Sequence, residues 1–143
     1  MSPVRAFSLV AGVVYLLIGV LGLSPLALWP GVPAEMGPFE GYLFDVLAVN
    51  WLLSLGYVLI GVCGLAAYRS FRATGAYTLA VGAVCSGLFL AGAFSPEAEA
   101  LGGWIPLEAA ANVLHLLTAL LALLLYCTAT LQRDRSPAAR ARP

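Results

Sequence analysis

The residue with the widest chemical range in this sequence is its only histidine, His115, which lies in the apolar stretch AAANVLHLL (109–117). An imidazole can carry protons, act as a general base or ligate a metal or haem. If this stretch is helical, Glu108, Asn112 and His115 share one helix face, because they are spaced at i, i+4 and i+7. His115 then lies about 10 Å along the helix from Glu108. The sequence therefore predicts a polar stripe on an apolar helix.

A second polar stripe occurs in the segment LFDVLAVNWLLSLGYVLIGVCGLAA (43–67), where Asn50, Ser54 and Tyr57 recur at helical spacing. Polar groups inside a membrane turn toward the protein interior, because lipid tails offer them no hydrogen-bond partners. Asn50 and Asn112 have similar predicted depths in the outward half of the bilayer. We therefore expect the two stripes to face each other and form interhelical hydrogen bonds, each contributing about 0.6–2 kcal/mol.

Three other interpretations give this cluster a chemical role. The polar residues could form an outward-facing site for a small molecule, lipid or ion, rimmed by Glu108 and Asp45. His115 could be an axial ligand of haem or chlorophyll, although one histidine per chain gives bis-histidine coordination only where two chains meet. Asp45, His115 and Glu108 could relay protons, but a relay needs more titratable groups at depth.

Patterns typical of enzymes are absent from the sequence. It contains no H-E-x-x-H element, no Walker glycine loop and no G-x-S-x-G elbow. Cys63, Cys85 and Cys127 are far apart and lack C-x-x-C spacing, which argues against a disulfide framework or a metal site. We expect neither catalysis nor a resident cofactor.

Composition identifies the surroundings of these residues as lipid. Of the 143 residues, 62% are hydrophobic and 10% are charged, against about half and a quarter in soluble domains. A chain of this length cannot bury so much apolar surface within itself. The formal net charge is zero, which gives no reason to expect nucleic-acid binding. We expect an all-α integral membrane protein.

Four segments are long and apolar enough to span a bilayer, which needs about 20 residues. They cover about residues 6–27, 43–67, 74–94 and 107–131, and predict a four-helix bundle forming one domain over 1–132. The connectors are rich in Pro, Gly or Arg. Residues 133–143 (RDRSPAARARP) predict a basic, flexible tail.

Charge placement predicts the orientation of the bundle. All seven arginines lie beyond the same ends of the predicted spans, and every acidic residue except Asp134 lies at the opposite ends. By the positive-inside rule, both termini and the loop at Tyr68–Gly75 are cytoplasmic. We expect location in the bacterial cytoplasmic (inner) membrane.

Recurring features suggest two tandem helical hairpins. LGLSP (21–25) and AGAFSP (91–96) each end a predicted span, and each is followed by a loop and a helix that carries an asparagine about two turns in. Small residues mark expected helix contacts, because they let backbones approach closely. These residues are Ala83, Gly87 and Ala91 in the third span, Gly12 and Gly19 in the first, and Gly56 and Gly64 in the second.

The segments 43–69 and IPLEAAANVLHLLTALLALLLY (105–126) resemble the bacterial membrane proteins grouped as domain of unknown function 4383. Members have four spans, a Gly-rich first helix, an Asn/His pair before G-x-x-G-L in the second helix, and Asp-Asn-x-x-His in the fourth. GVCGL (61–65) and NVLH (112–115) match, and the resemblance covers about residues 5–130.

Two departures from the family pattern bear on function. Ala111 stands where the family usually has aspartate, and the second span lacks a histidine, with Leu53 or Ser54 near the expected place. A catalytic or metal-binding cluster should be impaired by these changes, so they favour a structural role. We expect a structural or accessory subunit that contacts lipid and other membrane subunits or itself. The alternative is an outward-facing binder or transporter of a small or lipidic ligand.

Overall fold

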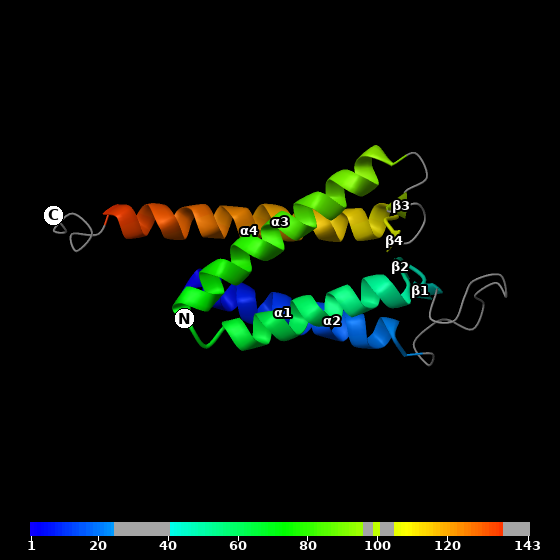
Figure 1. Cartoon of the computed structure of the whole chain (residues 1–143), viewed down its shortest axis with the longest axis horizontal. Helices are drawn as coiled ribbons and strands as arrows, with labels where there is room; N and C mark the ends of the chain where they lie inside the picture. The colour runs from blue at the N-terminus through cyan, green and yellow to red at the C-terminus, as the bar shows by residue number, and fades with distance from the viewer. Residues whose placement is uncertain (25–40, 96–98, 101–104, 136–143) are drawn as a thin grey trace.

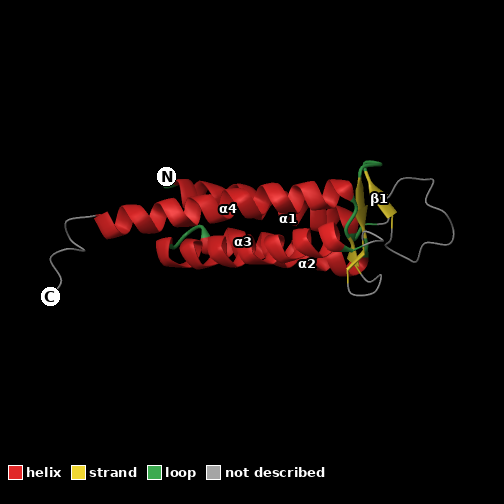
Figure 2. Cartoon of the chain, turned by 90° about the horizontal axis from the view of Figure 1, so that it is seen from above, coloured by secondary structure: helices red, strands yellow, loops and turns green. Residues whose placement is uncertain are grey.

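The computed structural model describes residues 1–24, 41–95, 99–100 and 105–135. They form four helices, α1 (Pro3–Gly22), α2 (Trp51–Ala67), α3 (Phe71–Phe94) and α4 (Ala109–Arg135). The helices run roughly along one axis, and short strands gather at one end of the bundle (Figure 2). The predicted all-α helical bundle is confirmed.

The helices pack as two hairpins. α1 lies along α2, and α3 lies along α4 with an oblique crossing (Figure 1). Contacts between the two hairpins are sparser than contacts within them. The arrangement agrees with the tandem hairpins expected from the sequence.

α1 and α2 approach closely because glycines face each other along their contact. A Cβ atom added to Gly12 would lie 2.9 Å from Leu65 N, and one added to Gly64 would lie 2.8 Å from the Cα of Gly12. A Cβ on Gly19 would lie 2.6 Å from Val58 N. The expected roles of Gly12, Gly19 and Gly64 as contact residues are confirmed.

The predicted second span, 43–67, is wrong over its first residues. Strands β1 (Gly41–Leu43) and β2 (Leu47–Val49) form an antiparallel pair there, and α2 begins only at Trp51. Phe44 and Asp45 form the turn with φ of 54° and 58°. Hydropathy alone does not reveal this break, because the strands and the helix are both apolar.

A similar element precedes α4. Strands β3 (Glu99–Ala100) and β4 (Ile105–Pro106) pair in antiparallel fashion, and α4 starts three residues after β4. Each hairpin therefore has the order helix, strand pair, helix. This repeated order supports the two-hairpin interpretation more directly than the short sequence similarities do.

The other helix boundaries differ modestly from prediction. α1 starts at Pro3, with proline at a first-turn position that suits it, and ends at Gly22; residues 25–27 of the predicted first span lie outside the described residues. α3 starts earlier than predicted, at Phe71, where Ser70 caps the helix through the Ala73 amide. α4 extends through Arg135 into the predicted tail, and residues 136–143 are not described.

Three helices, α1, α3 and α4, are long and apolar enough to cross a membrane. α2 is apolar but has only 17 residues. Large apolar side chains cover the outer surfaces of the bundle, including Leu17 at 57% and Leu124 at 62% exposure. This distribution fits a protein whose outer surface contacts lipid.

At the end of the bundle that carries Arg5, which we call the arginine end, this side chain binds backbone carbonyls of another segment. Arg5 of α1 donates hydrogen bonds from Nε to the Tyr68 carbonyl at 3.0 Å and from Nη2 to the Arg69 carbonyl at 2.5 Å. These carbonyls belong to the connection between α2 and α3. The start of α1 and the α2–α3 connection therefore lie at the same end, opposite the strand pairs (Figure 2).

Candidate functional site

The predicted contact between α2 and α4 is present, and its central pair is Tyr57 and His115. The Tyr57 hydroxyl lies 3.0 Å from His115 Nε2 in a hydrogen bond. Tyr57 is 1% exposed and His115 is 0% exposed. Because both side chains are buried within the bundle, the bond joins the facing helices α2 and α4.

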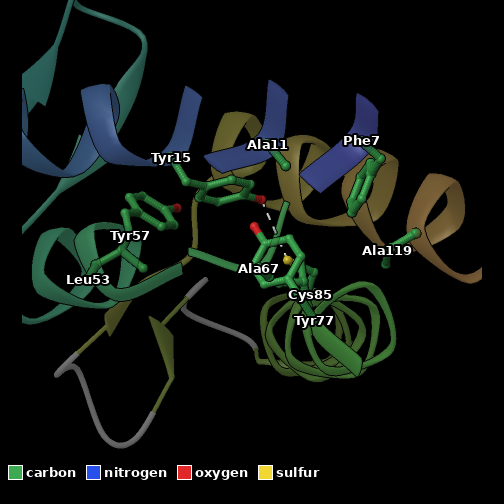
Figure 3. Packing of buried hydrophobic residues seen from close by; sticks show 11 residues of the cluster. Phe7, Ala11, Tyr15, Leu53, Tyr57, Ala67, Tyr77, Cys85 and Ala119 are labelled. Atoms are coloured by element: carbon green, nitrogen blue, oxygen red, sulfur yellow. Dashed lines mark hydrogen bonds between the residues drawn. The ribbon is translucent and has the colours of Figure 1, made fainter. Parts of the chain in front are cut away.

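Three further residues extend this contact and were not among the predicted site residues. The Tyr15 hydroxyl of α1 donates to Thr118 Oγ1 of α4 at 2.9 Å and lies 3.5 Å from Cys85 Sγ of α3. Figure 3 shows Tyr15 reaching from α1 toward Cys85, with Tyr57 beside it. The rings of Tyr15 and Tyr57 meet edge to face with centroids 5.3 Å apart.

We call Tyr15, Tyr57, Cys85, His115 and Thr118 the central polar cluster. All four helices contribute to it, and its bonds run mainly between the two hairpins. Thr118 could have been found from the sequence, because it lies at i+3 from His115 on nearly the same helix face. Tyr15 and Cys85 could not, since helical periodicity does not say which faces of α1 and α3 meet.

Asn112 does not take its predicted place. We expected it to lie opposite Asn50 on the second helix, but its side chain lies against Gly92 of α3, where an added Cβ would overlap its amide atoms. The amide can approach α3 this closely because glycine has no side chain there. Asn112 thus belongs to the contact within the second hairpin.

Asn50 also has a different role from the one predicted. It precedes α2 as its N-cap, and its Oδ1 accepts a hydrogen bond from the Leu53 amide at 2.8 Å. Asparagine is among the preferred residues at this position, because its side chain satisfies an otherwise unpaired helix amide. The expectation of an asparagine two turns inside each second helix is therefore wrong.

Ser54 is fully buried one turn above Tyr57 and packs beside Gly22 of α1. Its Oγ has no hydrogen-bond partner within the described part of the chain, and the same holds for His115 Nδ1 and Asn112 Oδ1. Buried polar atoms are usually paired with protein or ordered water. These three atoms mark the part of the predicted cluster that still has hydrogen-bonding capacity.

Glu108 lies at the strand end of the bundle and accepts a hydrogen bond from the Tyr42 hydroxyl of β1. This bond raises the pKa of Tyr42 above its usual 10.0, and burial and the nearby charges of Glu108 and Asp45 act in the same direction. The structure thus brings Glu108 and Asp45 to one rim, as the sequence suggested. No hydrogen bond among the described residues links Glu108 to His115.

Within the described ranges, no group of three or more His, Cys, Asp or Glu side chains lies close enough together to hold a metal ion. Of the two ring nitrogens of His115 that could ligate haem, Nε2 is engaged with Tyr57 and Nδ1 is unpartnered. These residues form an interhelical hydrogen-bond cluster, and the unpartnered atoms of Ser54, Asn112 and His115 beside it could bind a small ligand.

The expected small-residue face of the third span is not a contact within the chain. Ala83 and Gly87 are exposed, and Ala91 is half-buried. A Cβ added to Gly87 or to Gly56 would meet no atom within 4 Å. Gly56 and the Ala83–Gly87 face therefore make no helix contact within the described part of the bundle, and their predicted role as contact faces stays a prediction.

Comparison with known families identifies the family of this chain. The model of the family described as domain of unknown function (DUF4383) matches residues 5–128, which include all of the central polar cluster. The chain belongs to the DUF4383 family. No curated protein and no solved structure matches it. Ala111, where the resemblance implied an aspartate, is 0% exposed at the start of α4.

Proposed function

We propose that this DUF4383 protein is a noncatalytic structural or accessory subunit of a larger membrane assembly. The observation that carries the proposal is the outward face of α3. Ala83 and Gly87 are exposed there, and no part of the described chain would contact a Cβ at Gly87. Small residues on a membrane helix allow another helix to pack closely. α3 therefore offers a helix-packing surface that its own bundle does not use.

The arrangement of charge supports a four-span topology with both termini in the cytoplasm. Arg5 and the α2–α3 connection lie together at one end, while Asp45 and Glu108 lie at the other. α2 is about 26 Å long, close to the roughly 30 Å hydrocarbon core. By the positive-inside rule, the arginine end faces the cytoplasm of a bacterial inner membrane.

The topology is tested by labelling intact cells with a membrane-impermeant maleimide. Cysteines are introduced singly at Asp45 and Ser70, both exposed, in a background without the exposed Cys63 and Cys127. The Asp45→Cys protein should react from outside, and Ser70→Cys should react only after lysis. The reverse pattern would overturn the orientation.

The subunit role is tested by purification in mild detergent after crosslinking in the membrane. We expect a defined partner or a second copy to remain bound to the wild type and to be lost from Gly87→Leu. Gly56→Leu is the matched control, because a Cβ at Gly56 of α2 likewise meets no atom within 4 Å and Gly56 lies away from the α3 face. A chain that always purifies alone, or a Gly87→Leu variant that keeps its partner, would contradict the proposal.

The unpartnered atoms of His115, Ser54 and Asn112 favour a second candidate, an outward-facing binder or transporter of a small or lipidic ligand. Haemin is the simplest probe, because His115 is the only histidine. Binding predicts a shift of haemin absorbance that is absent in His115→Ala. A wild type that leaves the haemin spectrum unchanged would reject ligation by His115.

A further inference from the structure

Two grooves open at the arginine end of the bundle, where α4 continues beyond its neighbours (Figure 1). One groove, of about 340 Å³, lies between α3 and α4; the other, of about 350 Å³, lies between the start of α1 and α4. Both volumes fall in the range of small-molecule sites, roughly 300–1,000 Å³. Val4, Phe71 and Ala129 line both grooves and separate them.

The α3–α4 groove has a cationic mouth and an apolar floor. Arg72 and Tyr126 line it near the end of the bundle, and Gly75, Ala76 and Leu79 continue it along α3. Leu79 lies about 10 Å from Arg72 along the helix. The groove contains no acidic side chain among its lining residues. Its shape and charge are therefore those of a site for a molecule with an anionic head and an apolar tail.

Some polar groups near the mouth of the groove already form hydrogen bonds within the chain, and others do not. Thr130 donates to the Cys127 carbonyl, and Arg5, outside the groove, is held by two backbone carbonyls. Arg72 and the Tyr126 hydroxyl make no hydrogen bond or ion pair with any described residue. An exposed guanidinium can donate two hydrogen bonds to the oxygens of one phosphate group.

The depth of the groove matches a lipid headgroup. Arg72 is the second residue of α3, at the end of a helix that is apolar enough to cross a membrane. Basic residues at this level of a membrane protein attract anionic lipids. The missing side chain at Gly75 keeps the floor open, because no atom lies within 4 Å of the place a Cβ would occupy.

We propose that the groove between α3 and α4 binds one anionic phospholipid of the inner leaflet. Its phosphate contacts Arg72 and the Tyr126 hydroxyl, and one acyl chain lies along Gly75, Ala76 and Leu79. The second acyl chain lies across Phe71 in the neighbouring groove, beside Leu125 and Thr128. Phe71, which is 60% exposed, packs between the two chains.

The test is native mass spectrometry of delipidated protein after addition of phosphatidylglycerol or phosphatidylcholine with the same acyl chains. We expect wild type to bind phosphatidylglycerol about tenfold more tightly, the preference that one headgroup interaction of moderate strength provides. Arg72→Gln should remove the preference while retaining weak binding of both lipids. Arg69→Gln is the control, because Arg69 is an exposed arginine at the same end that does not line either groove.

The proposed acyl-chain contact is tested with Gly75→Leu, whose side chain fills the floor of the groove and should lower the affinity for both lipids at least tenfold. If the Gly75→Leu protein does not elute as a folded monodisperse species, Ala76→Leu, which fills the same floor, is used in its place. Gly87→Leu, on the outward face of α3, should bind both lipids like wild type. Equal affinity of wild type for the two lipids, an unchanged preference in Arg72→Gln, or full competition by glycerol 3-phosphate would overturn the proposal.

Discussion

The two helical hairpins are held together by different kinds of contact. In the α1–α2 hairpin, glycines meet backbone: a Cβ on Gly61 would lie 2.5 Å from Leu16 N and 2.6 Å from its Cα. In the α3–α4 hairpin, glycines meet side chains: a Cβ on Gly82 would lie 3.0 Å from Leu123 Cδ2. Backbone atoms cannot move without moving a helix, whereas a leucine side chain can rotate.

The difference implies that the two hairpins have different structural roles. The contact between α1 and α2 is closed by Gly12, Gly19, Gly61 and Gly64, so its geometry tolerates little change, and Gly56 faces away from that contact. The second keeps open glycines at Gly75 and Gly87, which line a groove and an outward face. We infer that the first hairpin is the rigid part of the bundle and that the second presents the surfaces used for lipid and partners.

The largest loss of stability is expected from Gly61→Ala. The new methyl group overlaps the Leu16 backbone, so α1 and α2 must separate, at a cost of roughly 3 kcal/mol in the free energy of unfolding. The measurement is the detergent-solubilised thermal unfolding midpoint. Gly56→Ala, on the same helix with no neighbour within 4 Å of the Cβ, should unfold at or above the wild-type temperature. Equal midpoints for the two variants would refute the backbone-contact account.

A smaller loss of stability is expected from Tyr57→Phe, which removes one of the hydrogen bonds between the hairpins, that between Tyr57 and His115. The ring and its packing against Tyr15 remain, but His115 loses its only hydrogen-bond partner among the described residues. We expect a loss of about 1–2 kcal/mol. A double-mutant cycle with His115→Leu isolates the bond from the other consequences of each change. Additive effects in that cycle would show that the pair does not couple α2 to α4.

Much of this arrangement could be predicted from the sequence, because hydropathy and polar spacing are local properties. Four helices and a contact between the polar faces of α2 and α4 follow from them, although the sequence placed Asn50 and not Tyr57 at the centre of that contact. The β1–β2 pair could not be recognised by hydropathy, because it continues the apolar run into α2. The asparagine at position 50 was the signal in the sequence for where α2 begins, since asparagine favours the N-cap over a helix interior.

The partners of small and polar residues were the least predictable features. Glycine spacing marks a face that can be approached closely but does not say whether this chain or another molecule approaches it. Gly12 meets α2, whereas Gly87 meets nothing in the described chain. Asn112 was placed opposite Asn50 by depth alone, yet the absence of a side chain at Gly92 draws it to α3. Such choices depend on tertiary packing that single-helix periodicity does not contain.

A modest gain in the stability of the isolated chain is expected from Gly87→Ala. Replacing glycine by alanine in a helix interior stabilises by about 0.5–1 kcal/mol when the methyl group meets nothing. The unfolding midpoint of purified single chains should therefore rise slightly. In the membrane, the same methyl group should weaken crosslinking to a partner through α3. A fall in the midpoint of the isolated chain would mean that Gly87 is packed within the bundle, against the observed outward position.

The smallest net effect is expected from Gly82→Ala, the variant that most sharply separates the two hairpins. Its methyl group would lie 3.0 Å from Leu123 Cδ2 and 3.3 Å from the Cβ of Ala122, so Leu123 must shift by a few tenths of an ångström. That cost should nearly offset the helix-propensity gain of about 0.5–1 kcal/mol. We expect an unfolding midpoint close to wild type. Adding Leu123→Ala, compared with Leu123→Ala alone, should uncover part of the gain, because the leucine that had to move is absent and only the 3.3 Å contact with the Cβ of Ala122 remains. If Gly82→Ala instead destabilises as strongly as Gly61→Ala, both hairpins are limited by backbone contact and the distinction between them fails.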